Sequence, residues 1–193
     1  MYKLLIFIAF IIQSHSTYCQ DIVEFGNNKS LGKYYNVRGV NFYTEQYGSG
    51  KPLLLIHGNG GSINSMAGII PYFSQQYKVI AVDSRAQGKT TDISDSLSFE
   101  MMADDEAALL DQMHIDSAYV IGWSDGGIIA LLLAMRHPSK VIKLASTGAN
   151  IWPDSTAILP SLWKDDMKYY EDHHSRIWTS LKEKNDWKLF MLD

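Results

Sequence analysis

The residues best suited to chemistry lie in the segment Gly122-Trp123-Ser124-Asp125-Gly126, which has the pattern Gly-x-Ser-x-Gly. A serine hydroxyl attacks a carbonyl carbon when a base takes its proton, and the resulting tetrahedral intermediate carries a negative oxygen. Glycines on both sides of the serine permit a tight turn with positive φ that exposes the hydroxyl. The pattern therefore predicts Ser124 as a nucleophile for acyl transfer or hydrolysis.

The flanking segments predict that this serine lies between a strand and a helix. Residues 118–121 are apolar, β-branched and aromatic, and residues 128–135 form an apolar run that ends at His137-Pro138. The N–H of Asp125 then falls in the first turn of a helix, where unpaired donors and the helix dipole favour a developing oxyanion. We expect Asp125 to supply one backbone oxyanion donor; an ordinary turn from strand to helix is the alternative interpretation.

Strands and helices alternate along the rest of the chain, which predicts the α/β class with a mostly parallel sheet flanked by helices. A hairpin around Gly39 is expected to open the sheet. The expected strands are 34–38, 40–47, 53–56, 77–83, 118–121 and 140–146, and the expected helices are 62–76, 98–114 and 128–135. On the helix over 98–114 we expect an outer, solvated face that carries Asp104, Asp105, Glu106 and Asp111.

Three motifs in a fixed order resemble the α/β-hydrolase fold family. They are His57-Gly58 after one expected strand, Asp83-x-Arg85-x-x-Gly88 after the next strand, and the serine turn. The resemblance runs from about Val37 to Asn150 and implies that Asn59, which follows the first His-Gly pair, gives the second oxyanion N–H. We expect His57 to shape this loop rather than to act as a base.

The segment from Gly122 to Gly127, taken together with Gly148-Ala149-Asn150, further resembles the biphenyl hydrolase-like, or valacyclovirase-like, esterase branch of the family. This narrower resemblance implies carboxylic ester substrates. It leaves two interpretations of the Asp125 side chain, which either binds a cationic group such as the α-amine of an amino-acid ester or is an acid favoured by the helix dipole. Trp123 and Trp152 are further candidates for contact with the substrate.

A nucleophilic serine needs a base, and in this family the acid and the histidine of the triad follow the serine on later strands. No such pair is recognisable in this sequence. Asp154 and His173-His174 come in a permitted order, but we interpret adjacent histidines in a charged segment as surface residues. We therefore expect the chain to be the N-terminal part of a longer hydrolase, ending within a helical lid and inactive alone.

Residues 1–19 predict a secretory signal peptide. Lys3 supplies its positive end, and residues 4–12 are apolar but too short to span a bilayer. Cleavage is expected after Cys19, which is the only cysteine, so the mature chain would hold no disulfide and no cysteine metal ligand. Lipidation of Cys19 is the rival interpretation, and the bulk of the preceding Tyr18 disfavours it.

Composition narrows the classes of partner. The net charge of -4 gives no electrostatic case for binding nucleic acid.

Residues 83–90 resemble a phosphate-binding loop in sequence, but Asp83 stands where the first glycine of such a loop is needed. We therefore expect Asp83 and Arg85 to stabilise a turn instead. No metal, organic cofactor or membrane span is expected.

These inferences combine into an exported serine hydrolase, secreted or periplasmic, that acts on small-molecule carboxylic esters. We call the strand-to-helix turn that carries Ser124 the elbow. A serine at this elbow disfavours the aspartate-nucleophile mechanism of haloalkane dehalogenases and epoxide hydrolases. The alternative from another class is a non-catalytic binding protein with the same fold. The expected organisation is a signal peptide at 1–19, a linker at 20–33, the core at 34–150 and the lid at 151–193.

Overall fold

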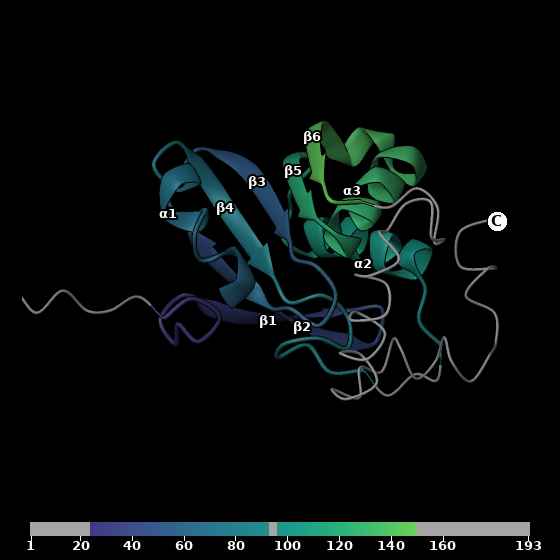
Figure 1. The fold of residues 1–193 in the computed structure, drawn as a ribbon, viewed down its shortest axis with the longest axis horizontal. Coiled ribbons are helices and arrows are strands. Elements are labelled where there is room, and N and C mark those ends of the chain that lie inside the picture. The colour runs from purple at the N-terminus through teal and green to yellow at the C-terminus, as the bar shows by residue number, and fades with distance from the viewer. Residues whose placement is uncertain (1–23, 93–95, 150–193) are drawn as a thin grey trace, which may run out of the picture.

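The computed structural model describes residues 24–92 and 96–149, which Figure 1 shows as a twisted sheet with helices packed against it. The expected signal peptide and the expected lid lie outside the described residues. The same holds for four residues singled out in the sequence, which are Trp152, Asp154, His173 and His174.

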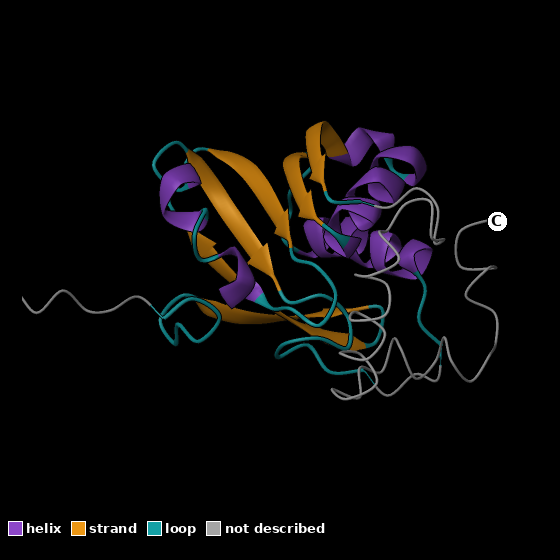
Figure 2. Ribbon diagram, viewed as in Figure 1, coloured by secondary structure: helices purple, strands orange, loops and turns teal. Residues whose placement is uncertain are grey.

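Within the described residues, six strands form the sheet in the order β1-β2-β4-β3-β5-β6. Figure 2 draws these strands in orange. The pairs β1–β2 and β2–β4 are antiparallel, whereas β4–β3, β3–β5 and β5–β6 are parallel. The mostly parallel α/β sheet expected from the alternating elements is therefore confirmed, as is the hairpin that opens it. The strands are β1 Gly32–Val37, β2 Val40–Tyr47, β3 Lys51–Ile56, β4 Tyr77–Val82, β5 Ala118–Trp123 and β6 Val141–Thr147.

Helices cover both faces of this sheet. The two long helices, α2 Phe99–Gln112 and α3 Asp125–Arg136, pack on one face, and the short helices η1 Ile63–Met66 and α1 Ile70–Phe73 pack on the other. A third short helix, η2 Pro138–Lys140, joins α3 to β6. Within the part of the chain that the structure describes, no helix is long and apolar enough to cross a bilayer.

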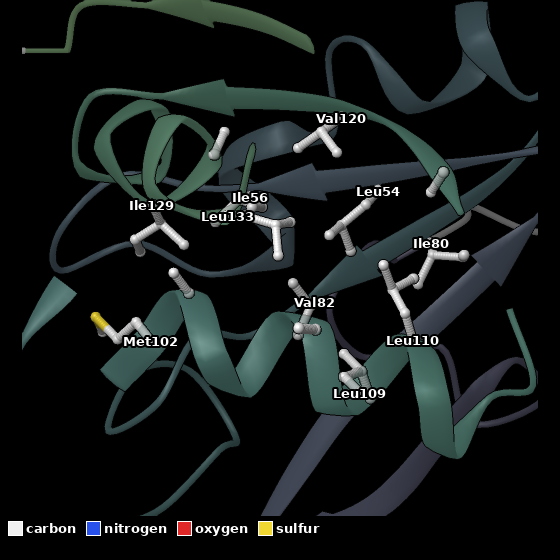
Figure 3. Packing of buried hydrophobic residues seen from close by; sticks show 14 of the residues in the cluster. Leu54, Ile56, Ile80, Val82, Met102, Leu109, Leu110, Val120, Ile129 and Leu133 are labelled. Carbon is white, nitrogen blue, oxygen red and sulfur yellow. The ribbon is translucent and has the colours of Figure 1, made fainter. Parts of the chain in front are cut away.

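The central strand β3 explains why its sequence is a continuous apolar run. Leu54 and Ile56 point into the core under α2 and α3, where Figure 3 shows them near Leu110 and Leu133. Leu53 and Leu55 point to the opposite face, against η1 and α1. Side chains alternate between the two faces of a sheet along a strand. A strand that is buried on both faces is therefore apolar at every position.

The helix expected over 62–76 is wrong in its extent, because the structure has η1 and α1 in its place. Gly68 between them has a low helix propensity, and Pro71 lacks the N–H that a helix interior needs. Pro71 is instead tolerated in the first turn of α1, where no N–H is required.

The linker expected over 20–33 is also corrected where it is described. Strand β1 begins at Gly32, and the turns before it are fixed to the buried carboxylate of Glu45. The N–H groups of Gly26 and Asn28 each donate to that carboxylate, with N–O distances of 2.7 Å. Residues 24–31 are therefore held against β2 by hydrogen bonds, although none of them is fully buried.

Helix α2 begins where the sequence predicted, because the hydroxyl of Ser98 accepts a hydrogen bond from the N–H of Met101 as an N-cap. The expected outer face is wrong for two of its acids. Asp105 and Glu106 are buried, with 0% and 1% of their surface exposed. Asp105 is tolerated there because the guanidinium of Arg85 pairs with it.

Candidate active site

Ser124 forms the sharp turn between β5 and α3 that the Gly-x-Ser-x-Gly pattern predicts. Its backbone has φ 54° and ψ -123°, a strained conformation that the surroundings must hold in place. A Cβ on Gly122 would lie 2.1 Å from the carbonyl oxygen of Gly126, and a Cβ on Gly126 would lie 2.2 Å from that of Ile56. A side chain at either glycine would therefore collide with the neighbouring backbone. The turn is further held by a hydrogen bond from the N–H of Ser124 to the carbonyl oxygen of Thr147 at 2.8 Å.

The loop that follows β3 lies directly against this elbow. Strands β3 and β5 are neighbours with Ile56 paired to Gly122, so both chains leave the sheet at the same edge. A Cβ on Gly58 would lie 3.0 Å from Cβ of Ser124, which measures how closely the two segments approach. The structure thus brings the loop that carries Asn59 to the serine, as the resemblance implied.

The two expected oxyanion donors, the N–H groups of Asn59 and Asp125, have no competing acceptor among the described residues. Asp125 is the first residue of α3, where the helix dipole adds partial positive charge. Its own carboxyl group is desolvated, and burial raises its pKa to about 6.

His57 has no free ring nitrogen. Its Nε2 accepts from the N–H of Ser84 at 3.1 Å, so the proton sits on Nδ1, which donates to Gly58 O at 2.7 Å. Burial lowers the pKa of His57, which keeps the imidazole neutral in this arrangement. The geometry agrees with the expectation that His57 shapes the loop.

The two other described histidines lie at the opposite end of the sheet from Ser124. His114 precedes β5, whereas Ser124 follows it. His137 follows α3, whose length separates it from the elbow by about 18 Å, and its Nε2 lies 2.7 Å from Oδ1 of Asp104. No histidine within the described ranges is therefore placed to take the proton of Ser124.

The tryptophan of the elbow faces solvent. The side chain of Trp123 is 49% exposed, although it lies one residue before the serine. A Cβ on Gly58 would meet Cε3 of the indole at 3.4 Å, and one on Gly148 would meet its Nε1 at 3.7 Å. The indole thus lies close to both Gly58 and Gly148, on the two loops that border Ser124.

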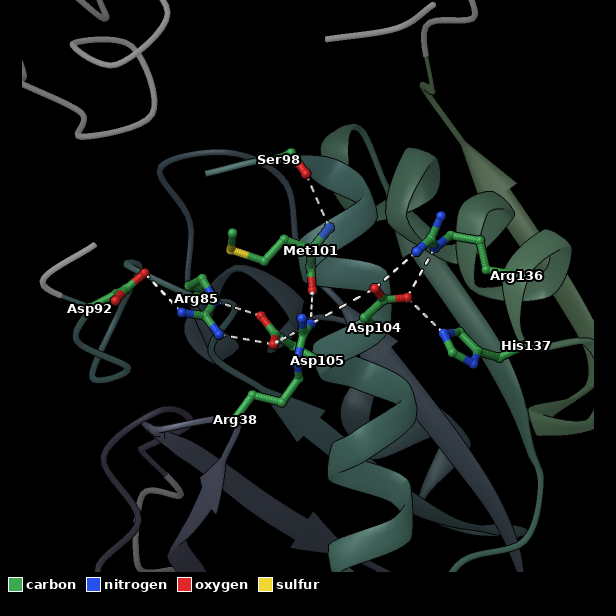
Figure 4. A network of polar contacts seen from close by, with 9 residues as sticks. All are labelled: Arg38, Arg85, Asp92, Ser98, Met101, Asp104, Asp105, Arg136 and His137. Atoms are coloured by element: carbon green, nitrogen blue, oxygen red, sulfur yellow. Dashed lines mark hydrogen bonds and ion pairs between the residues drawn. The ribbon is translucent and has the colours of Figure 1, made fainter. Parts of the chain in front are cut away.

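A buried ion-pair network joins the turn after β4 to α2 (Figure 4). These ion pairs were not predicted from the sequence. Arg85 donates twice to Asp105, from Nε at 2.5 Å and from Nη2 at 2.9 Å, and its Nη1 lies 2.9 Å from Asp92. The sequence did hold a signal, because position 105 follows Met102 by three residues and precedes Leu109 by four, which places it on the apolar face. No metal-binding cluster of acidic, histidine or cysteine residues is found in the described part of the chain.

Comparisons with known proteins agree with this geometry. The sequence profile of the family described as alpha/beta hydrolase fold matches residues 51–177. A 2-hydroxymuconate semialdehyde hydrolase from a Pseudomonas species is 31% identical over 127 residues, which are 64% of this chain and 45% of that protein. A pimeloyl-[acyl-carrier protein] methyl ester esterase from Legionella pneumophila is 37% identical over 102 residues, 53% of this chain and 39% of that protein.

Solved structures give the same result. A meta-cleavage product hydrolase from Pseudomonas fluorescens is 30% identical with a TM-score of 0.57, over 62% of this chain and 46% of that one. An N-acyl homoserine lactonase complexed with N-butanoyl homoserine is 33% identical with a TM-score of 0.58, over 62% and 45%. The chain spans less than half the length of these relatives. Since the family profile covers well over half of this sequence and the described elements fit it, the chain belongs to the α/β hydrolase fold family.

Proposed function

We propose that the protein is a serine hydrolase that acts on carboxylic esters of small molecules, with Ser124 as the nucleophile. The observation that carries this proposal is the backbone of Ser124, which is held at φ 54° between a buried strand and a helix N-terminus. Strain of this kind persists only where the surroundings enforce it, and it concentrates at functional sites. The names of two relatives, a methyl ester esterase and a lactonase, support ester chemistry.

In the proposed reaction the hydroxyl of Ser124 attacks the ester carbonyl carbon, and the carbonyl oxygen becomes an oxyanion. The N–H groups of Asn59 and Asp125 donate to that oxygen. Donors of this type act most strongly on the transition state, and removing one generally costs about 3–4 kcal/mol of barrier. The alcohol then leaves with the proton that the base took from Ser124. Water next attacks the acyl carbon while the base takes its proton, and the acid leaves as that proton returns to Ser124.

The base that takes the proton of Ser124 lies outside the described residues in this proposal. Both ring nitrogens of His57 are occupied, and His114 and His137 lie at the far edge of the sheet. Loss of the base from a catalytic triad typically lowers turnover by about a millionfold. The second candidate function, a non-catalytic binding protein that keeps the elbow and lacks a base, therefore makes a sharply different kinetic prediction.

Labelling with a fluorophosphonate separates the two candidates. In the full-length protein, which includes the base in this proposal, the expected result is rapid, saturable labelling that disappears in Ser124→Ala and persists in Ser49→Ala, a control at an exposed serine in the turn between β2 and β3. Labelling no faster than in Ser124→Ala would refute the hydrolase and favour the binding protein. Hydrolysis of simple p-nitrophenyl esters by the same three proteins gives an independent measure.

Two side chains at the elbow bear on the class of ester. The carboxyl of Asp125 lies one residue from the nucleophile and is desolvated, so an ammonium group on the substrate would find a strong partner there. Trp123 offers an exposed aromatic surface beside it. In this proposal Asp125→Asn lowers kcat/KM for amino-acid esters and leaves neutral esters unchanged; an unchanged ratio between the two would refute the cation site.

Export is the final part of the proposal and rests on residues 1–19. Mass spectrometry of the mature protein from its native host is expected to find an N-terminus at Gln20. A thioether-linked lipid on Cys19 would instead support the lipoprotein interpretation, and an intact N-terminus would refute export through a cleaved signal.

A further inference from the structure

We propose that Asp83 is a positioning residue that sets the place of the oxyanion loop, which we define as residues 57–63. This inference rests on the proposed function, because it assigns the loop the task of presenting the Asn59 N–H to the reacting oxygen. Asp83 itself lies after β4, on a separate segment of the chain, and touches no reacting atom.

The carboxylate of Asp83 bridges two backbone segments. Its Oδ1 accepts from the N–H of Ile63 at 2.7 Å, and its Oδ2 accepts from the N–H of Lys89 at 2.7 Å. The residue is buried, with 1% of its surface exposed. A buried carboxylate that uses both oxygens on backbone donors holds those donors firmly, because either N–H would otherwise lack a partner away from water.

The neighbouring residue holds the other end of the loop. The N–H of Ser84 donates to Nε2 of His57 at 3.1 Å, and Nδ1 of His57 donates to Gly58 O at 2.7 Å. Within the loop, Gly61 N–H donates to the same carbonyl at 3.1 Å. Consecutive residues after β4 therefore fix the first and last residues of the oxyanion loop.

The turn that carries Asp83 is itself held in place by contacts that do not involve the loop. The hydroxyl of Thr90 donates to Asp83 O at 2.6 Å and accepts from Tyr43 N–H at 2.9 Å. Arg85 is anchored to Asp105 of α2, as Figure 4 shows. The turn is thus attached to β2 and α2, and it can act as a fixed reference for the loop.

Gly88 shows how tightly the turn closes over the carboxylate. It has φ 55°, and a Cβ built on it would lie 2.3 Å from Cγ of Asp83. A methyl group at this position would have to displace the carboxylate or the turn. Gly39 provides a matched comparison, because it has φ 83° but a Cβ there would meet nothing within 4 Å.

Displacement of the loop has a distinctive kinetic effect. An oxyanion donor interacts with charge that develops only in the transition state, so its misplacement lowers kcat and leaves KM nearly unchanged. A shift of about 1 Å can lower a rate by about a hundredfold. A purely structural role for Asp83 would instead lower the amount of folded protein without altering the kcat of the folded fraction.

The test uses Asp83→Asn, in which an amide nitrogen replaces one of the two accepting oxygens, and Asp116→Asn as a control at an exposed carboxylate. We expect Asp83→Asn to lower kcat about 10- to 100-fold at nearly constant KM, and to weaken binding of a trifluoromethyl ketone, which mimics the tetrahedral intermediate, by the same factor. Gly88→Ala should do likewise, whereas Gly39→Ala and Asp116→Asn should match the wild type in both measurements.

Hydrogen exchange measured by mass spectrometry supplies a readout that does not depend on catalysis. Faster exchange confined to peptides that cover 57–63 in Asp83→Asn and Gly88→Ala supports the proposal. Wild-type kcat and ketone affinity in either folded variant, or unchanged exchange in the loop, would overturn it. If the wild-type protein neither hydrolyses esters nor labels at Ser124, the proposed function fails, and the exchange data alone decide whether Asp83 holds the loop.

Discussion

Glu106 makes the stability of the fold depend on pH. It lies on the inner face of α2 with 1% of its surface exposed, and no described residue forms a hydrogen bond with its Oε2. Burial and, to a smaller extent, the charge of Asp105 together raise the pKa of its carboxyl to about 8. The side chain is therefore protonated in the folded protein at neutral pH, whereas it is ionised in the unfolded chain.

The sign and size of the effect follow from proton linkage. The folded state holds a proton that the unfolded state releases above about pH 4.5, so the free energy of unfolding is highest below that pH and falls until about pH 8. Each pH unit in this window is worth about 1.4 kcal/mol. We expect Glu106 to lower the stability by about 3 kcal/mol between pH 5 and pH 7.

Glu106→Gln removes the ionisation and keeps the shape. The free energy of unfolding is measured in urea at pH 5, 6, 7 and 8. At pH 5 the variant and the wild type are expected to be similar in stability. At pH 7 the variant's advantage in the free energy of unfolding should be about 3 kcal/mol larger than at pH 5. Other groups, including Asp125, titrate in both proteins and cancel in the difference. Glu106→Met, which also removes the unpaired oxygen, should show the same pH dependence with a higher stability throughout. Parallel pH profiles for wild type and Glu106→Gln would refute the reasoning.

Three further substitutions test the packing around the site, each by urea unfolding. Ser98→Ala removes the N-cap hydrogen bond of α2 and should cost about 1 kcal/mol. Gly126→Ala places a methyl group 2.2 Å from the carbonyl of Ile56 and should cost about 3 kcal/mol or more. Arg85→Met removes both guanidinium bonds to buried Asp105 and should cost about 3 kcal/mol. Stabilities within 0.5 kcal/mol of wild type, roughly the range of neutral surface changes, would contradict each estimate.

The parts of the fold that local sequence predicts well are those whose signal is local. The strand before Ser124, the glycines around it and the helix after it each follow from backbone geometry within a few residues. The same is true of the start of α2, which the helical spacing from position 98 predicts to within one residue. In these places the residue types and their spacing carry the information, and tertiary contacts only reinforce it.

Burial of charged side chains was harder to predict because their partners lie far along the chain. The sequence pattern places Asp105 on an exposed helix face, whereas in the structure the guanidinium of Arg85, which is distant in sequence, is its bidentate partner. In the same way, the turns at 24–31 resemble a linker in composition, and only Glu45 on β2 reveals that their N–H groups are bound. A hydrophobicity pattern cannot detect a charge that is neutralised by a remote segment.

The arrangement of the sheet explains why the chemistry gathers at one edge. Strands β3, β4 and β5 are parallel neighbours, so the segments that follow them leave the sheet on the same side. The first of these segments carries Asn59, the second carries Asp83, and the third carries Ser124. Because β4 lies beside β3, on the side away from β5, the turn that follows β4 can hold the oxyanion loop without lying between that loop and Ser124. The strand order thus separates the residues that would react from the residue that positions them.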